Sequence, residues 1–199
     1  MDRQVFFWLF LLSVLSFFPL VLFFGNSYLH EGSIHLGMFS FAMFFLWKGD
    51  IGETLKSLGI PGNMKKNVVA VFAGFAAIML IGLLLGIAAD AFGFNDEEAI
   101  WEKISALPFY IILAAAFVAP ISEEIFFRAL LTPRFGVVLS SLAFGLSHFS
   151  YGSVVEVAGA TLIGVVLALI YRHTKSIVPS MAIHFLYNLA ALVIMRLVM

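Results

Sequence analysis

Long apolar runs are the feature that most constrains this sequence. Residues 5–24 and 67–89 are each about 20 mostly apolar residues long, which is what an α-helix needs to cross the hydrocarbon core of a bilayer. The runs are continuous rather than alternating, which favours helices over the strands of a membrane β-barrel. Only 12% of the residues are charged, too few to cover a water-soluble globule. The sequence therefore predicts an all-α, polytopic transmembrane helical bundle.

The same criterion divides the chain into seven predicted spans. They cover residues 5–24, 33–47, 67–89, 105–131, 135–151, 153–171 and 176–196. The count becomes eight if the fourth or the seventh span is broken. Pro120 lies inside the fourth span, where we expect it to kink the helix and open a water-accessible pocket. We expect one integrated membrane domain, with amino-terminal helices and loops in residues 1–104 and a helical core in residues 105–199.

Lysine and arginine residues predict the orientation, because cytoplasmic loops hold the excess of them. With seven spans, the lysine-rich loop at residues 48–66 and the turns that contain Arg134 and Arg172 fall on one side, together with Arg3. The acidic loop at residues 90–103 falls on the other side. The amino terminus is therefore predicted to be cytoplasmic, in a multi-pass protein of the cell membrane. The net charge of −1 provides no basic surface for nucleic acid.

Ionisable side chains inside apolar spans are costly and are functional candidates by default. Glu124 and Arg128 are four residues apart, so they can pair on one face of a helix. Glu123 is rotated about 100° from Glu124 and has no partner nearby in the sequence. This asymmetry predicts a working carboxylate at Glu123 and a structural ion pair between Glu124 and Arg128.

Three further polar residues fall at the same predicted depth as Glu123. At about 1.5 Å per residue from the cytoplasmic turns, Glu123 and His184 lie roughly 12 Å into the membrane. Asn188 and His148 lie roughly 18 and 20 Å deep on the same scale. All four residues therefore fall near the middle of a core about 30 Å thick. Glu156, His30, His35 and His173 are instead predicted to lie near interfaces, where water or headgroups satisfy them.

Three short motifs occur in order along the chain: Glu-Glu-x-x-x-Arg from Glu123, Phe-x-x-x-His from Phe144, and His-x-x-x-Asn from His184. In these motifs the chain resembles the CPBP family, the CAAX-protease and bacteriocin-processing (Abi) intramembrane endopeptidases, which are related to the CAAX prenyl protease type 2. The resemblance covers about residues 105–198. It implies hydrolysis of a peptide bond in a membrane-tethered protein or peptide, with residues 105–199 as the catalytic core.

The resemblance also implies roles for the polar residues. Glu123 and His148 would hold and deprotonate a water, and His184 and Asn188 would stabilise the oxyanion. Members of the family are usually classed as metalloproteases, and Glu123, His148 and His184 form a ligand set that catalytic zinc uses. Activation of the water by zinc and activation by the carboxylate alone both stay open. Glu124 and Arg128 would support the site without taking part in the reaction.

Other functions are compatible with buried carboxylates and histidines. A small transporter or proton-relay protein would also place such groups within the membrane. An inactive family member could act as an immunity or scaffold protein. A Ser147–His184 dyad is a further alternative for hydrolysis. The absence of cysteine excludes a cysteine protease.

Overall fold

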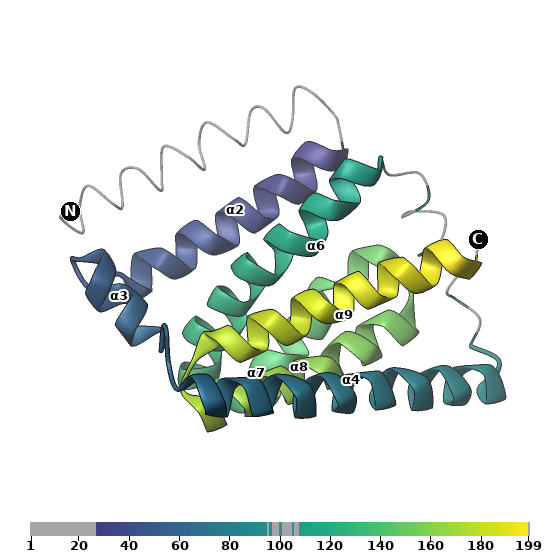
Figure 1. Cartoon of the computed structure of the whole chain (residues 1–199). Coiled ribbons are helices and arrows are strands. Elements are labelled where there is room, and N and C mark those ends of the chain that lie inside the picture. Colours follow the sequence, from purple (N-terminus) through teal and green to yellow (C-terminus); the bar gives the residue numbers. More distant parts are fainter. Residues whose placement is uncertain (1–26, 95, 97–99, 101–104, 106–107, 199) are drawn as a thin grey trace.

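The structure, a computed structural model, describes residues 27–94, 96, 100, 105 and 108–198, and in this part of the chain every regular element is a helix (Figure 1). By length and composition, four helical stretches in it could cross a membrane: Met64–Phe92, Ala116–Tyr151, Val154–Thr174 and Ile177–Ile194. The second of these contains the non-helical residue Gly136, where the chain reverses. The helical prediction is thus confirmed, and the apolar helices fit a multi-pass membrane protein. The predicted first span lies outside the described residues, so the count of seven or eight spans stays a prediction.

The amino-terminal half contributes three described helices: α2 (Ser27–Leu46), α3 (Ile51–Ser57) and α4 (Met64–Phe92). Side-chain caps begin the second and third, since Asp50 accepts a hydrogen bond from the Glu53 amide and Asn63 accepts one from the Lys66 amide. Helix α2 begins at Ser27 rather than at residue 33. It is therefore a 20-residue helix, and the polar residues that precede residue 33 are part of it.

A π-helix interrupts the fourth predicted span. Helix α6 (Phe109–Glu123) contains Pro120 and continues directly into the π-helix η1 (Glu124–Leu131). Proline lacks the backbone N–H that donates a hydrogen bond within a helix. π-Helical turns are rare overall, and those that occur are often found at functional sites. Glu123 is the last residue of α6 and Glu124 is the first residue of η1, so the two carboxylates lie at the junction between the two helix types.

The chain then folds back on itself within α7 (Thr132–Ser147), where Gly136 has φ 82° and ψ 175°. The rings of Phe127 and Phe144 lie 5.1 Å apart, whereas 17 residues of straight helix would separate them by about 25 Å. The reversal thus lies at Gly136 and not at residues 132–134, where the sequence predicted a link. Pro133 instead sits in the first turn of α7, a position that tolerates proline.

Two further helices complete the described bundle, α8 (Val154–Thr174) and α9 (Ile177–Val198), with a short 3-10 turn, η2 (Phe149–Tyr151), before α8. Helix α7 approaches α8 closely at Gly145, where a Cβ atom would lie 1.8 Å from the Thr161 hydroxyl and 2.7 Å from the Val157 carbonyl oxygen. Helix α4 packs on α8 and α9 through a buried apolar cluster of Ile78, Ile163, Leu167 and Ile183.

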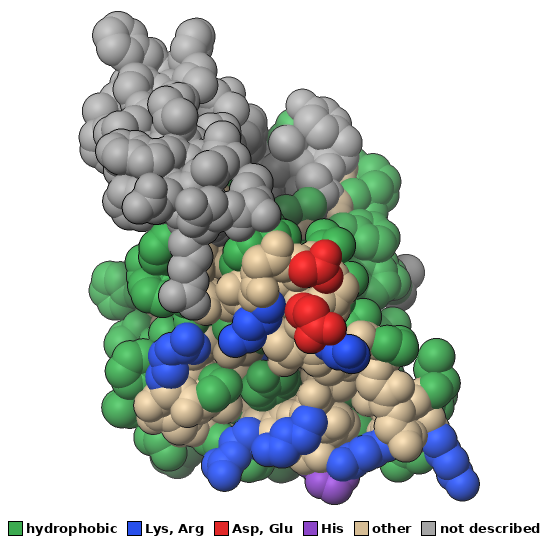
Figure 2. All heavy atoms as spheres, turned by 90° about the vertical axis from the view of Figure 1, so that its left-hand side faces the viewer, with side chains coloured by type: hydrophobic (Ala, Val, Ile, Leu, Met, Phe, Trp, Pro, Cys, Tyr) green, Lys and Arg blue, Asp and Glu red, His purple; other side chains and the backbone are tan. Residues whose placement is uncertain are grey.

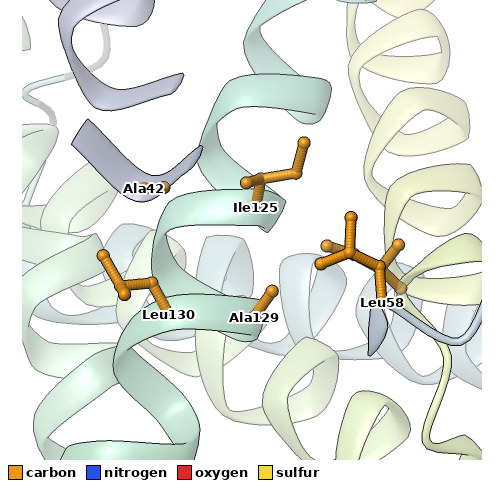
Figure 3. Packing of buried hydrophobic residues seen from close by; sticks show 6 residues of the cluster. Ala42, Leu58, Ile125, Ala129 and Leu130 are labelled. Carbon is orange, nitrogen blue, oxygen red and sulfur yellow. The ribbon is translucent and has the colours of Figure 1, made fainter. Parts of the chain in front are cut away.

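The basic loops meet at one end of the molecule. Leu58 from the lysine-rich loop packs in one buried cluster with Leu130 near the end of η1 and with Ile177 at the start of α9 (Figure 3). The Ile177 amide donates to the Leu58 carbonyl oxygen at 3.0 Å. Figure 2 views this end and shows lysine and arginine side chains spread across it. The basic loops therefore share one side, and its assignment to the cytoplasm stays a prediction.

Asp96 from the predicted acidic loop binds the opposite end of α8. Its carboxylate accepts hydrogen bonds from the Ser153 hydroxyl at 2.7 Å and from the Val154 amide. Desolvation opposes ionisation, but the hydrogen bonds from Ser153, Val154 and Val155 outweigh it and hold the pKa of Asp96 below its ordinary value. The negative charge also lies favourably at a helix amino terminus.

The Asp96→Asn variant should therefore be less stable at neutral pH by about 1 kcal/mol, as for the loss of a helix cap. A depressed folded-state pKa contributes stability above the unfolded value of about 3.9, and this contribution is lost as the pH falls through the folded-state pKa. Thermal unfolding in detergent between pH 3 and 7 measures this effect. The difference in unfolding midpoint between the variant and the wild type should become smaller at acid pH. Asp90→Asn, at an exposed carboxylate, is the control. A difference that stays constant with pH would contradict the role of the charge.

Candidate active site

Two adjacent carboxylates bracket one imidazole. Glu124 Oε1 lies 3.0 Å from His184 Nδ1, and Glu123 Oε2 lies 3.7 Å from His184 Nε2. Glu123 is only 8% exposed and Glu124 is fully buried. The junction between α6 and η1 thus presents both carboxylates to α9, where His184 lies. The sequence predicted two separate roles for these residues, and in the structure both are linked through His184.

Glu124 and Arg128 form the predicted ion pair. Glu124 Oε2 lies 3.1 Å from Arg128 Nε, and both side chains are completely buried. The guanidinium also lies over the Phe144 ring, 4.3 Å from the centroid, a favourable arrangement for a buried cation. Since Glu124 is held as an anion by Arg128, His184 Nδ1 must be the donor in its bond to Glu124. Nε2 of a neutral His184 then carries a lone pair that faces Glu123.

Phe144 joins His148 to this group. The ring centroids of His148 and His184 lie 4.8 and 5.7 Å from that of Phe144, so both imidazoles contact the same phenyl ring. His148 follows the last residue of α7, and its Nδ1 lies 2.9 Å from the Phe144 carbonyl oxygen. A bond to a carbonyl makes Nδ1 the donor and leaves Nε2 as the free acceptor. The Phe-x-x-x-His motif therefore sets the tautomer of its own histidine.

Three other residues that the sequence analysis singled out are Asn188, Glu156 and Ser147. Asn188 is partly buried one turn after His184 on α9, and Glu156 is partly buried in the first turn of α8. Ser147 donates to the Phe144 carbonyl oxygen at 2.7 Å. In the structure the Ser147 hydroxyl is thus engaged by a backbone carbonyl, and His184 contacts Glu123, Glu124 and Phe144.

His35 is the residue of this site that sequence reasoning missed. Its Nδ1 lies 2.9 Å from the Ser122 hydroxyl oxygen and 3.7 Å from Glu123 Oε1. Ser122 Oγ also lies 3.0 Å from the Ala119 carbonyl oxygen, to which it donates, so the hydroxyl accepts from His35. The prediction that His35 is interfacial depended on a helix beginning at residue 33, whereas α2 begins at Ser27 and places His35 well inside. A predicted helix start at residue 27 would have placed His35 inside the helix and not at its entrance.

The proposed zinc ligands are only partly assembled. His184 Nε2 and Glu123 Oε2 are 3.7 Å apart, a spacing that two ligands of one zinc ion can adopt. Among the described residues, however, no group of three or more histidine and acidic side chains is arranged to hold a metal. The residues as placed do not fit the complete ligand set of Glu123, His148 and His184.

Comparison with known proteins confirms the resemblance seen in the motifs. Residues 105–190 match the family model described as type II CAAX prenyl endopeptidase, Rce1-like. This stretch contains the two carboxylates, Arg128, His148, His184 and Asn188, and it excludes His35. Searches of curated proteins and of solved structures gave no significant match. The family match supports a CAAX-type intramembrane endopeptidase in general.

Proposed function

We propose that the protein hydrolyses a peptide bond in a membrane-tethered protein or peptide, using a water activated by Glu123. The match of residues 105–190 to the Rce1-like family model supports an endopeptidase in general. One observation carries the assignment to Glu123. Among the described residues, its buried Oε2 has no hydrogen-bond partner, and it faces His184 Nε2 at 3.7 Å. This distance is too long for a direct hydrogen bond and suits two groups that hold one water or substrate oxygen between them.

The reaction follows from the proton positions at these groups. Glu123 accepts a proton from the water as its oxygen attacks the carbonyl carbon of the substrate, and a tetrahedral oxyanion forms. The Asn188 amide donates to that oxyanion, and His184 donates from Nε2 in its doubly protonated form, whose additional proton comes from solvent before the attack and stays on the ring throughout. Glu123 then delivers its proton to the leaving nitrogen as the carbon–nitrogen bond breaks. His148, with Nε2 free, helps to orient the water.

Glu124 and Arg128 fix the tautomer and the orientation of the His184 ring. An anionic Glu124 requires a proton on Nδ1, and the other ring nitrogen, Nε2, then faces Glu123. This is the role that a buried orienting carboxylate has in other hydrolases. The proposal can be tested with purified protein in liposomes, which should release a soluble fragment from a membrane-tethered reporter peptide. Failure to cleave any member of a broad reporter panel would contradict it.

Zinc is the cofactor that this family resemblance suggests, and its requirement can be measured directly. Since the described residues do not assemble three ligands, we expect reporter cleavage to survive prolonged treatment with a chelator, with less than a twofold loss. Elemental analysis of the purified protein should then show far less than one zinc per chain. Loss of cleavage that zinc alone restores would contradict this expectation and show that zinc is required, with Glu123, His148 and His184 as the residues that would hold it.

His35 is proposed to position Glu123 through Ser122, because its Nδ1 donates to the Ser122 hydroxyl and lies 3.7 Å from Glu123 Oε1, whereas His184 faces Oε2. Removing the N–H donor to the Ser122 hydroxyl, next to Glu123, costs about 1–2 kcal/mol, so His35→Leu should lower kcat about 5- to 30-fold with little change in KM. His35→Asn keeps a donor at the position of Nδ1 and should recover most of the rate. His173→Asn, at an exposed histidine, is the control. A normal kcat for His35→Leu would contradict this role.

A further inference from the structure

A groove of about 740 Å³ lies between α4 and α8, on side chains that the proposed reaction does not use. Helix α4 lines it with small residues at helical spacing, including Ala73 and Ala77, and α8 lines it with larger ones, including Ile170. Both helices are long and apolar enough to cross a membrane. The side chains of Val69 and Leu169 on its walls are 62% and 52% exposed. In a membrane, this groove therefore opens to lipid.

One end of the groove is positively charged. Lys65 and Lys66 from the first turn of α4 line this end with His173 from the last turn of α8. The ammonium group of Lys66 donates to the His173 carbonyl oxygen. Neither lysine pairs with a carboxylate among the described residues, and the first turn of α4 contains no acidic residue. The partial positive charge of the helix amino terminus adds to that of the lysines.

From this combination we propose that the groove is a binding site for an anionic phospholipid. The phosphate would lie at Lys65 and Lys66, and one acyl chain would lie along the apolar wall toward Ala77. Lys65 and Ala77 are about 18 Å apart along α4, which gives room for much of a chain. Basic residues at the membrane surface attract anionic lipids, and this end of the molecule carries the basic loops (Figure 2).

The test uses the full-length chain purified in detergent and two phospholipids with identical acyl chains, phosphatidylglycerol and phosphatidylcholine. Native mass spectrometry should show one tightly retained phosphatidylglycerol and weaker binding of phosphatidylcholine. The double variant Lys65→Gln/Lys66→Gln should lose at least tenfold in affinity for phosphatidylglycerol only. Ala77→Phe should weaken binding of both lipids about equally, because it narrows the part of the groove that holds the chain.

Lys48→Gln/Lys56→Gln is the matched control, since it removes the same charge at residues that do not line the groove. Thermal unfolding of each variant shows whether it is folded. Equal retention of both lipids by the wild type would overturn the proposal, as would unchanged phosphatidylglycerol binding in the Lys65→Gln/Lys66→Gln variant. Complete competition by inorganic phosphate would indicate a simple anion site and would also overturn the proposal. A dimer that excludes lipid from the groove would identify a second copy of the chain as the occupant, with the same consequence. The proposal stands whether or not the protein is a protease.

Discussion

Replacing Glu123 by glutamine is expected to abolish proteolysis while leaving the fold intact. The amide keeps the volume of the carboxyl group, and it cannot accept a proton from the attacking water. General-base catalysis contributes about 10²–10⁴-fold, so the variant should retain 1% of the wild-type rate or less. The measurement compares membranes that contain the wild type or Glu123→Gln, by mass spectrometry of uncleaved precursors and of their fragments.

A matched control distinguishes loss of chemistry from loss of protein. Glu53→Gln makes the same change at a carboxylate whose side chain is 62% exposed and paired with Lys56, and it should leave cleavage unchanged. The thermal unfolding midpoint of Glu123→Gln should stay close to that of the wild type. Wild-type cleavage by a folded Glu123→Gln protein would remove Glu123 from the mechanism.

Replacing Glu124 by glutamine is expected to act mainly on stability. Arg128 is completely buried, and Glu124 is the only carboxylate among the described residues with which it forms an ion pair. Breaking such a pair on one side leaves an uncompensated buried charge, which costs about 3–5 kcal/mol. We expect a large fall in the thermal unfolding midpoint and in the yield of folded protein in detergent.

Removing both charges should reverse much of this loss. Replacing a buried ion pair by apolar or neutral groups of similar volume is often nearly neutral, so Glu124→Gln/Arg128→Met should be more stable than Glu124→Gln alone. If Glu124→Gln instead abolishes activity in a stably folded protein, while Glu123→Gln retains activity, the roles of the two carboxylates are reversed.

The long apolar runs were sufficient to predict the helices whose ends are marked by caps or polar turns. The predicted spans at residues 67–89, 153–171 and 176–196 correspond to α4, α8 and α9 within a few residues. Two local features were not predictable in the same way. Hydropathy penalises the polar residues at the start of α2, and the Thr132-Pro133-Arg134 sequence is typical both of a loop and of a helix amino terminus.

The candidate site could be predicted only where its residues are close in the sequence. The spacing of Glu124 and Arg128 indicated their ion pair, which the structure confirms. Helical periodicity could not show that Glu123 and Glu124 contact the two nitrogens of one imidazole, because this depends on where η1 begins and how α9 packs. The position of His35 beside Glu123 depends on a contact 88 residues away in the sequence. Only the tertiary structure brings these groups together.

The central claim is tested most directly by following peptide cleavage and ion movement in the same proteoliposomes. Purified wild-type protein should cut a membrane-tethered peptide at one bond, and mass spectrometry should identify both fragments. The same vesicles should hold an imposed proton gradient as well as protein-free vesicles do, and Glu123→Gln should produce neither fragment. A wild-type protein that leaves the peptide intact and dissipates the proton gradient through Glu123 would contradict the account and identify a proton pathway.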